Sequence, residues 1–538
     1  MVTLAPFATR YAPTGMVASV DHLASGAGVA AMRAGGSAVD AAIAASAVLA
    51  VTSQHMCGMG GDLFALVHEG GTGAPAVLNS SGRAGSGASA ERLRAGGLTS
   101  IPRTGHVAAV PVPGCVDGWL ALHERFGRLP LADVLAAART YAAGGFPASP
   151  TLAASVGRVL AGTAIAGWED YTERQHALRP GDIVRRPGVA RALDAIVKDG
   201  RAGFYEGEFG EGLLALGAGE YTDDDLRAPL ADWVDGLSID VWNRRVWTVP
   251  PNSQGYLTLA GAWIAGRLRL PDDPDDPLWA HLTVEAARHA GFDRVDVLHE
   301  HADGAALVAT ERLSARAALV RADAAADLPG TYGGGGTIYL CAADGRDGMG
   351  VSLIQSNYTG FGSLLVEPGT RIFLQNRGCG FSLAPAHPAE YGPGRRPPHT
   401  LAPAMVTHLD GGLDAVVGTM GGDSQPQVLL QLLARRWAAA EGAGASPGNA
   451  IAAPRWVLAG DEPGQDVWEQ RGRVRVAVEP HAPPAWFEGL RERGHDVVAL
   501  QPWSPQAGFA HLIAVDRETG VLAGASDPRS FGGVATGF

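Results

Sequence analysis

Thr337 stands at the end of a run of four glycines, and an apolar segment starts directly after it. Residues 338–343 predict a strand, and 351–354 predict a second strand after a polar turn at 344–348. A threonine hydroxyl is a weak nucleophile without a neighbouring base. If the peptide bond before Thr337 breaks, the new α-amine can accept the Oγ proton. The reference pKa of an α-amine is about 7.7–8.0, so part of it is unprotonated near neutral pH.

Gly336 suits such a cleavage. It has no Cβ, so it tolerates strained backbone angles and lets the Thr337 hydroxyl approach the preceding carbonyl. Attack there would give an ester, which water hydrolyses. The segment therefore predicts a chain that cleaves itself between Gly336 and Thr337 to expose a threonine nucleophile. The alternative is a surface glycine linker followed by an ordinary strand.

Short motifs run in order along most of the chain. They lie at 15–19, 23–25, 35–42, 55, 58–61, 112–114, 118, 126–130, 250–255, 281–286, 352–357, 361–363, 396–397 and 421–422. Each motif alone is weak, whereas their joint order and spacing are specific. By these motifs the chain resembles the γ-glutamyltransferase family of N-terminal-nucleophile hydrolases.

The resemblance implies an α/β fold, a four-layer αββα sandwich of two antiparallel sheets between helix layers. Cleavage would leave a large (α) subunit, 1–336, and a small (β) subunit, 337–538. The two would form one intertwined unit, an α/β heterodimer made from one chain. No external cofactor is implied.

The resemblance also assigns catalytic roles. Thr337 matches the nucleophile, and Ser356 matches a second hydroxyl residue that orients it. Gly421 and Gly422 match the paired glycines whose N–H groups form the oxyanion hole. Such a donor contributes about 2.7–4 kcal/mol at the transition state.

Substrate-binding positions depart from the family pattern. Relatives that act on γ-glutamyl groups hold the α-carboxylate with an arginine and two serines, and the α-amine with an acid. Here Ser81 stands where the arginine belongs, and Gly380 stands at the acid position. The residues expected to bind substrate are Arg83, Tyr358, Arg377, His399 and Thr400. Loss of the acid, with two arginines nearby, favours an acyl group that bears a carboxylate and no α-amine.

The sequence thus predicts a self-processing threonine amidohydrolase or acyltransferase that takes a small-molecule amide, with water or an amine as acceptor. Three alternatives remain open. One keeps a γ-glutamyl substrate, with Arg83 or Arg377 compensating for the missing arginine. Another is an oxalyl-, glutaryl- or similar acyl group, which includes the substrate of a natural-product pathway enzyme. The third is an unprocessed, catalytically silent binding protein.

Composition and residue spacing limit the partners, metal sites and location that the protein is expected to have. The chain has 42 basic and 55 acidic residues, a net charge of −13, and no basic stripe, so nucleic-acid and membrane partners are not expected. The four cysteines form no CxxC motif and are expected to be buried free thiols. His55, His106 and His399 lack the spacing of metal ligands, so no metal is expected. Residues 1–14 lack a basic region followed by an apolar core, which predicts a cytoplasmic location.

The elements that position these residues are predicted from hydrophobic periodicity and capping signals. Helices are expected at 38–51, 116–125, 131–143, 303–326 and 426–440, strands at 63–68, 76–78, 474–478 and 511–515, and a hairpin at 237–249. Ser25 is expected to cap a helix that ends at 35–36, and Ser37 to cap the next. Residues 223–225 are expected to cap or precede a helix at Leu226.

Overall fold

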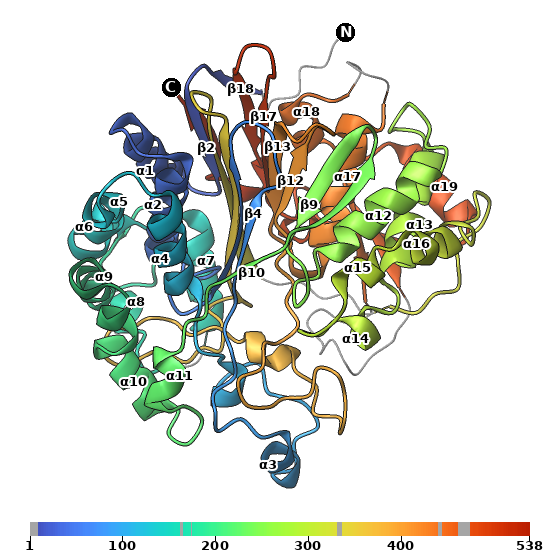
Figure 1. Ribbon diagram of the computed structural model, residues 1–538. Coiled ribbons are helices and arrows are strands. Elements are labelled where there is room, and N and C mark those ends of the chain that lie inside the picture. Colours follow the sequence, from blue (N-terminus) through green and yellow to red (C-terminus); the bar gives the residue numbers. More distant parts are fainter. Residues whose placement is uncertain (1–8, 162–164, 174, 331–335, 440–443, 461–473) are drawn as a thin grey trace.

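Two seven-stranded sheets pack face to face, and a layer of helices covers the outer face of each (Figure 1). This computed structural model describes residues 9–161, 165–173, 175–330, 336–439, 444–460 and 474–538. Residues 331–335, which hold most of the glycine run, lie outside the described residues. The predicted four-layer αββα sandwich is confirmed.

The first sheet contains Thr337. Its order is β19 (Val534–Gly537), β2 (Gly15–Ser19), β10 (Gly336–Asp344), β11 (Met349–Tyr358), β3 (Asp62–Glu69), β4 (Ala76–Ser80) and β7 (Asp232–Val234). All neighbours are antiparallel. Alternate residues of β10 face opposite sides, as the two-residue period of a strand requires. Tyr339 and Cys341 pack between the sheets, whereas Ile338 and Leu340 pack under the helices.

The second sheet faces the first across an apolar interior. Its order is β1 (Arg10–Ala12), β18 (Leu522–Ser526), β17 (Ala510–Val515), β13 (Leu413–Thr419), β12 (Ala404–Thr407), β9 (Arg244–Thr248) and β8 (Leu237–Val241). The predicted hairpin at 237–249 is confirmed as β8 and β9. Three further strands, β14 (Trp456–Ala459), β15 (Arg475–Val478) and β16 (Asp496–Ala499), form a small separate sheet, and β5 (Phe146–Pro147) pairs with β6 (Ile183–Val184).

The helices divide between the two outer faces (Figure 1). The layer on the first sheet contains α1 (His22–Arg33), α2 (Ala38–Thr52), α4 (Cys115–Phe126), α5 (Leu131–Val134), α6 (Ala136–Gly144), α7 (Pro150–Val159) and α9 (Pro187–Tyr205). The layer on the second sheet contains α12 (Tyr256–Arg267), α13 (Pro277–Gly291), α16 (Thr310–Ala317), α17 (Gln425–Trp437) and α19 (Pro484–Glu492). Shorter helices are α3 (Ala90–Ala95), α8 (Glu169–Thr172), α10 (Glu208–Leu216), α11 (Asp223–Arg227), α14 (Arg294–Val297), α15 (Gly304–Leu307) and α18 (Pro447–Ala452).

Helix α2 is buried along its whole length, as its run of apolar residues predicts. Ser37 caps it, and the cap is reciprocal: the Ser37 hydroxyl accepts from Asp40 N, and the Asp40 carboxylate accepts from Ser37 N. The prediction for Ser25 is wrong. Asp21 caps α1 by accepting from Leu23 N, and Ser25 lies inside that helix.

Two predicted helices differ from the structure. The one at 131–143 is divided at Leu135 into α5 and α6. The one at 303–326 is wrong over its second half, because α15 and α16 end by Ala317 and residues 318–329 are irregular. At 223–225 the aspartates form the first turn of α11, and Thr222 is the cap. All four cysteines are free and buried, as predicted. Among the described residues, no helix combines the length and apolarity needed to cross a membrane.

Candidate active site

Thr337 lies in a β-bulge at the start of β10. Gly336 pairs with Tyr358 of β11, but Ile338 pairs with Gln355. The strand register therefore shifts by one residue at Thr337. Bulges re-aim side chains and are frequent beside active sites. Tyr358 itself has a φ of +74°, in the left-handed region that non-glycine residues rarely adopt. The two strands are therefore distorted at the predicted cleavage point.

Two hydroxyl groups converge on the carbonyl oxygen of Gly336. The Thr337 Oγ1 donates to it at 2.7 Å, and the Ser356 Oγ donates to it at 2.6 Å. The two hydroxyl oxygens are 3.1 Å apart, and Ser356 Oγ also accepts from Tyr358 N at 2.8 Å. Both side chains are buried. The nucleophile thus lies beside the carbonyl that it would attack, and Ser356 can polarise that carbonyl.

Gly421 and Gly422 follow the end of β13, which packs across from β10. Gly418 lies directly against the Tyr339 ring, so the residues after Thr419 reach the edge of the sandwich where Thr337 lies. Their φ angles are +139° and +60°, which favour glycine.

The carbonyls of this turn are held by other groups. Gly421 O accepts from Ser424 Oγ at 2.9 Å, and Gly422 O accepts from Gln254 Nε2 at 2.9 Å. The N–H groups of Gly421 and Gly422 have no acceptor among the described residues. Two adjacent N–H groups with fixed carbonyls are suited to bind an oxyanion.

A salt bridge supports this turn, and sequence reasoning missed it. Arg294 pairs with Asp423, at 2.5 Å and 3.0 Å, and donates to Gln254 Oε1 at 2.8 Å. Gln254 in turn holds Gly422 O. The sequence partly indicated this network, because Gln254 lies in the 250–255 motif. Arg294 lies in none of the motifs.

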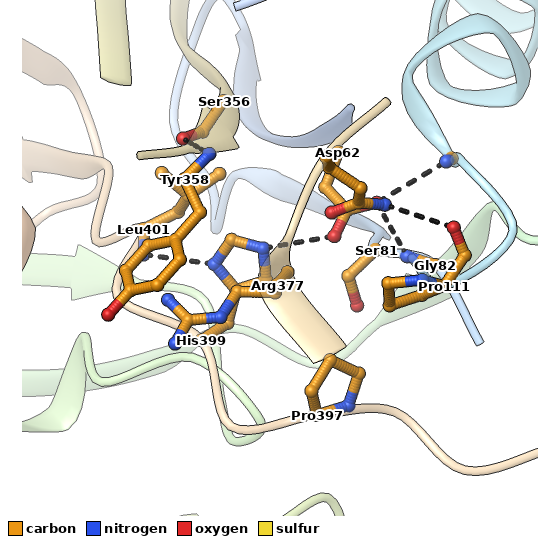
Figure 2. A network of polar contacts seen from close by, with 12 residues as sticks. Asp62, Ser81, Gly82, Pro111, Ser356, Tyr358, Arg377, Pro397, His399 and Leu401 are labelled. Atoms are coloured by element: carbon orange, nitrogen blue, oxygen red, sulfur yellow. Dashed lines mark hydrogen bonds and ion pairs between the residues drawn. The ribbon is translucent and has the colours of Figure 1, made fainter. Parts of the chain in front are cut away.

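A small pocket contains several of the predicted substrate-binding residues. Its polar lining includes Arg377, His399 and Thr400, and Gly380 forms part of the wall. Tyr358 lies beside them, with its ring centroid 3.6 Å from the Arg377 guanidinium carbon. Figure 2 shows Tyr358, Arg377 and His399 together, with Ser356 above them.

Two arginines line this pocket: Arg294, which is paired with Asp423, and Arg377. Arg377 is 1% exposed, and its Nη1 donates to Thr400 Oγ1 at 3.1 Å. Its Nε has no partner, and within the described part of the chain no carboxylate forms an ion pair with it. A Cβ at Gly380 would lie 2.9 Å from Arg377 Nη2. The glycine at the family's acid position therefore leaves the space that this guanidinium occupies.

His399 is neutral and held by Asp62 (Figure 2). Its Nε2 lies 3.1 Å from Asp62 Oδ2, and its Nδ1 accepts from Leu401 N at 3.3 Å, so the proton is on Nε2. Burial lowers the pKa of His399 to about 4. Asp62 also accepts from Gly82 N at 2.8 Å and Gln375 Nε2 at 2.7 Å. Asp62 was missed, although it directly follows the 58–61 motif.

Arg83 is not brought to this pocket. Its guanidinium lies 3.2 Å from Asp232 and 3.6 Å from Glu300, donates to Gly394 O, and is about one-third exposed. Two carboxylates from distant segments bind Arg83, so this geometry does not favour contact with substrate, and the role of Arg83 stays a prediction. Ser81, two residues earlier, is buried and donates to Asn79 Oδ1 at 2.8 Å.

The described residues hold no group of three or more His, Cys, Asp or Glu side chains that could bind a metal ion. The polar groups of the site are hydroxyl, guanidinium, imidazole and backbone groups, with the Asp62 carboxylate behind His399. This set can carry out acyl transfer through a hydroxyl nucleophile.

Comparisons with known proteins identify relatives that are named as amide-hydrolysing enzymes. Residues 24–537 match the family model described as Gamma-glutamyltranspeptidase. The oxamate amidohydrolase proenzyme of Klebsiella pneumoniae is 36% identical, covering 97% of this chain and 98% of its own. The glutathione hydrolase-like YwrD proenzyme of Bacillus subtilis is also 36% identical, covering 96% and 97%. The crystal structure of cephalosporin acylase from Bacillus halodurans is similar with a TM-score of 0.88 and 34% identity, covering 100% and 98%.

Proposed function

Because the chain belongs to the gamma-glutamyltranspeptidase family, we propose that it is a self-processing amidohydrolase for short acyl groups that carry a carboxylate and no α-amine. Thr337 is the nucleophile, Ser356 its orienting hydroxyl, and Gly421 and Gly422 the oxyanion donors. Arg377 binds the carboxylate of the acyl group, with Tyr358, His399 and Thr400 around it.

Self-processing starts at the Gly336 carbonyl. The Thr337 Oγ attacks its carbon, and the Ser356 hydroxyl, 2.6 Å from the carbonyl oxygen, stabilises the charge that develops there. The C–N bond then breaks, which transfers the acyl chain from nitrogen to oxygen. Water hydrolyses the ester. The products are a carboxylate on Gly336 and a free α-amine and hydroxyl on Thr337.

Substrate turnover repeats this chemistry with the new amine as base. The Thr337 α-amine accepts the Oγ proton while Oγ attacks the amide carbonyl. The N–H groups of Gly421 and Gly422 stabilise the oxyanion, and the proton passes to the departing amine. Water then hydrolyses the acyl-enzyme. An amine in place of water would make the reaction a transfer.

The observation that carries the substrate assignment is the buried guanidinium of Arg377, which forms no ion pair with a carboxylate of the described residues. A buried charge is costly unless an opposite charge accompanies it, so a bound carboxylate is its natural partner. Gly380 supplies no acid to hold an α-amine. One relative is named an oxamate amidohydrolase, and oxamate, the monoamide of oxalic acid, has this chemistry. The small size of the pocket favours a short chain.

A panel of amides with one leaving group tests the assignment. We expect p-nitroanilides of oxalic, malonic, succinic or glutaric acid to exceed the matched acyl anilides without a carboxylate by about 100-fold in kcat/KM. The γ-glutamyl p-nitroanilide should be a weak substrate. Arg377→Met should abolish the preference for a carboxylate, whereas Arg83→Met, the matched control, should leave it intact. Robust γ-glutamyl turnover, or an unchanged preference in Arg377→Met, would refute the proposal.

A further inference from the structure

The motif at 281–286 has no contact with the candidate active site, yet it holds an irregular segment that leads to the cleavage point. We call residues 321–328 the strap, and His281, Glu285 and Arg288 of α13 the clamp. The spacing of four and three residues puts the clamp side chains on one face of the helix. In Figure 1, α13 lies beside α16 and α19 on the right of the molecule.

Glu285 and Arg288 hold the strap by its backbone at Ala326. Glu285 Oε2 accepts from Ala326 N at 2.9 Å, and Arg288 Nη2 donates to Ala326 O at 2.7 Å and to Leu328 O at 3.3 Å. Arg288 Nη1 also pairs with Glu285 Oε1 at 2.7 Å. Both side chains are buried. A buried ion pair that binds both the N–H and the C=O of one residue fixes the orientation of the two peptide groups that flank it.

His281 holds the start of the strap. Its Nε2 is 2.7 Å from Arg321 O, a carbonyl that can only accept, so Nε2 carries the proton. Its Nδ1 then accepts from His495 Nε2 at 2.8 Å. On the far side, Arg493 O accepts from Ala325 N at 2.7 Å. The strap is thus held between α13 and the end of α19.

The strap sequence, Arg-Ala-Asp-Ala-Ala-Ala-Asp-Leu, favours a helix, since alanine has the highest helix propensity. It is nevertheless irregular. The clamp takes the N–H and C=O groups that a helix would use for itself. A conflict between local preference and observed structure is characteristic of functional positions.

We propose that the clamp is a positioning device for self-cleavage. It fixes the strap, so that only a short length of chain separates the strap from the peptide beside the Ser356 hydroxyl. This inference rests on the proposed self-processing at Gly336–Thr337. The clamp residues touch neither the scissile peptide nor substrate, so they are positioning residues and not catalytic ones.

Tether length sets the expected size of the effect. Leu328 lies eight residues before Gly336, Ala325 eleven, and Ala317, the end of α16, nineteen. Loop-closure probability falls with about the 3/2 power of length. Loss of the grip at Ala326 therefore slows cleavage about 1.6-fold if Arg493 still holds Ala325, and about four-fold if the whole strap detaches.

The experiment follows cleavage of freshly translated full-length chain on denaturing gels over time. Arg288→Lys keeps the charge beside Glu285 but cannot donate to Ala326 O and Leu328 O together. Its matched control is Arg316→Lys. Arg316 is a buried arginine of α16 that pairs with Asp293, and among the described residues it has no hydrogen bond or ion pair to the strap. The second variant, Ala326→Pro, changes the strap instead of the clamp, because it removes the N–H group that donates to Glu285.

The control for Ala326→Pro is Ala324→Pro, since Ala324 N donates no hydrogen bond among the described residues. We expect Arg288→Lys and Ala326→Pro to slow cleavage by about 1.6- to four-fold, with kcat/KM per cleaved molecule unchanged. The two controls should cleave at the unaltered rate. Equal cleavage rates in all four variants would overturn the proposed role of the clamp. A parallel loss of cleavage and turnover would overturn it as well. An unaltered chain that never cleaves would instead overturn the proposed self-processing.

Discussion

Ser356 and Thr337 share one acceptor, the carbonyl oxygen of Gly336, and this sharing separates their roles. Thr337 must lose its hydroxyl proton to attack. Ser356 keeps its hydroxyl proton and donates a hydrogen bond to the oxygen that becomes negative. Because Tyr358 N donates to Ser356 Oγ, the serine hydrogen is directed toward Gly336. On the proposed function, Ser356 would thus act as an oxyanion donor for self-cleavage.

Removing that donor should slow self-cleavage. Loss of one oxyanion donor costs about 2.7–4 kcal/mol at the transition state, so Ser356→Ala should slow fragment formation about 100- to 1,000-fold. The time course of cleavage on denaturing gels measures this. Ser352→Ala is the matched control, because Ser352 lies on the same face of β11 and its hydroxyl contacts Tyr339 Oη at 3.0 Å. Similar rates in the two variants would exclude the assigned role.

At the scale of elements, α2 is positioned through one carboxylate. Asp40 Oδ2 accepts from Ser37 N at 2.8 Å inside the cap, and from Arg128 N at 2.9 Å and Leu129 N at 3.3 Å in the 126–130 motif. One side chain therefore both starts a fully buried helix and fixes the loop after α4 to it. Helix α2 packs on β10 and β11, so it supports the strands that hold the candidate nucleophile.

Asp40→Ala should lower the free energy of unfolding by about 2–4 kcal/mol, because three N–H groups lose a charged acceptor in a buried site. Denaturant unfolding followed by tryptophan fluorescence measures the change. Asp303→Ala is the control: Asp303 caps the short helix α15 through a single bond to Ala306 N at 3.0 Å, so the expected loss is about 1 kcal/mol. A loss in Asp40→Ala no larger than in Asp303→Ala would contradict the role of Asp40 as a junction.

The elements around the site were predictable where local pattern and tertiary structure agree. The strands after Thr337, helix α2 and the hairpin at 237–249 all follow from periodicity and turn residues. The helix at 303–326 failed because side chains of α13 outcompete alanine propensity in the strap.

The side-chain contacts that the sequence could not predict at the site join residues that are far apart along the chain. Arg83 looked like a substrate cation because Asp232 and Glu300, which bind it, are 149 and 217 residues away. Asp62 escaped notice because its partner His399 is 337 residues later. Pairings over such separations exist only in the folded chain. Arg377 was predictable as a residue type, but its lack of a carboxylate partner was not.

At the scale of the whole molecule, buried histidines should make stability depend on pH. Burial lowers the pKa of His55, His399, His495 and His511 to about 4 each. In the unfolded chain these residues titrate near 6.5. Between those values the unfolded chain binds more protons, so stability falls as pH drops from 6.5 toward 4 and is not affected by these groups above about 7.

The thermal unfolding midpoint should therefore be flat between pH 7 and 8 and fall steadily from pH 6.5 to 4. His511→Phe should weaken this dependence, because both ring nitrogens of His511 are buried without a partner and its ring stacks on Tyr339. Scanning calorimetry of both proteins across this pH range provides the comparison. A midpoint that does not change from pH 7 down to 5 would mean that these histidines are not held neutral by burial.

The order of strands decides what self-cleavage can do to the molecule. In the first sheet, β2 of the large fragment lies between β19 and β10 of the small fragment, and β11 pairs with β3. In the second sheet, β1, β8 and β9 flank four strands of the small fragment. Each fragment alone would expose open sheet edges and apolar faces, so the pieces should stay together after the bond breaks.

Denaturing gels should accordingly show two bands of about 35 and 21 kDa, in proportion to 336 and 202 residues of a 55.4 kDa chain. Native size-exclusion chromatography should give one peak that contains both. N-terminal sequencing of the smaller band should begin at Thr337, and Thr337→Ala should remain a single 55.4 kDa band by both methods. Fragments that elute separately without denaturant would show that the interleaved sheets do not hold them, and a first residue other than Thr337 would place the nucleophile elsewhere.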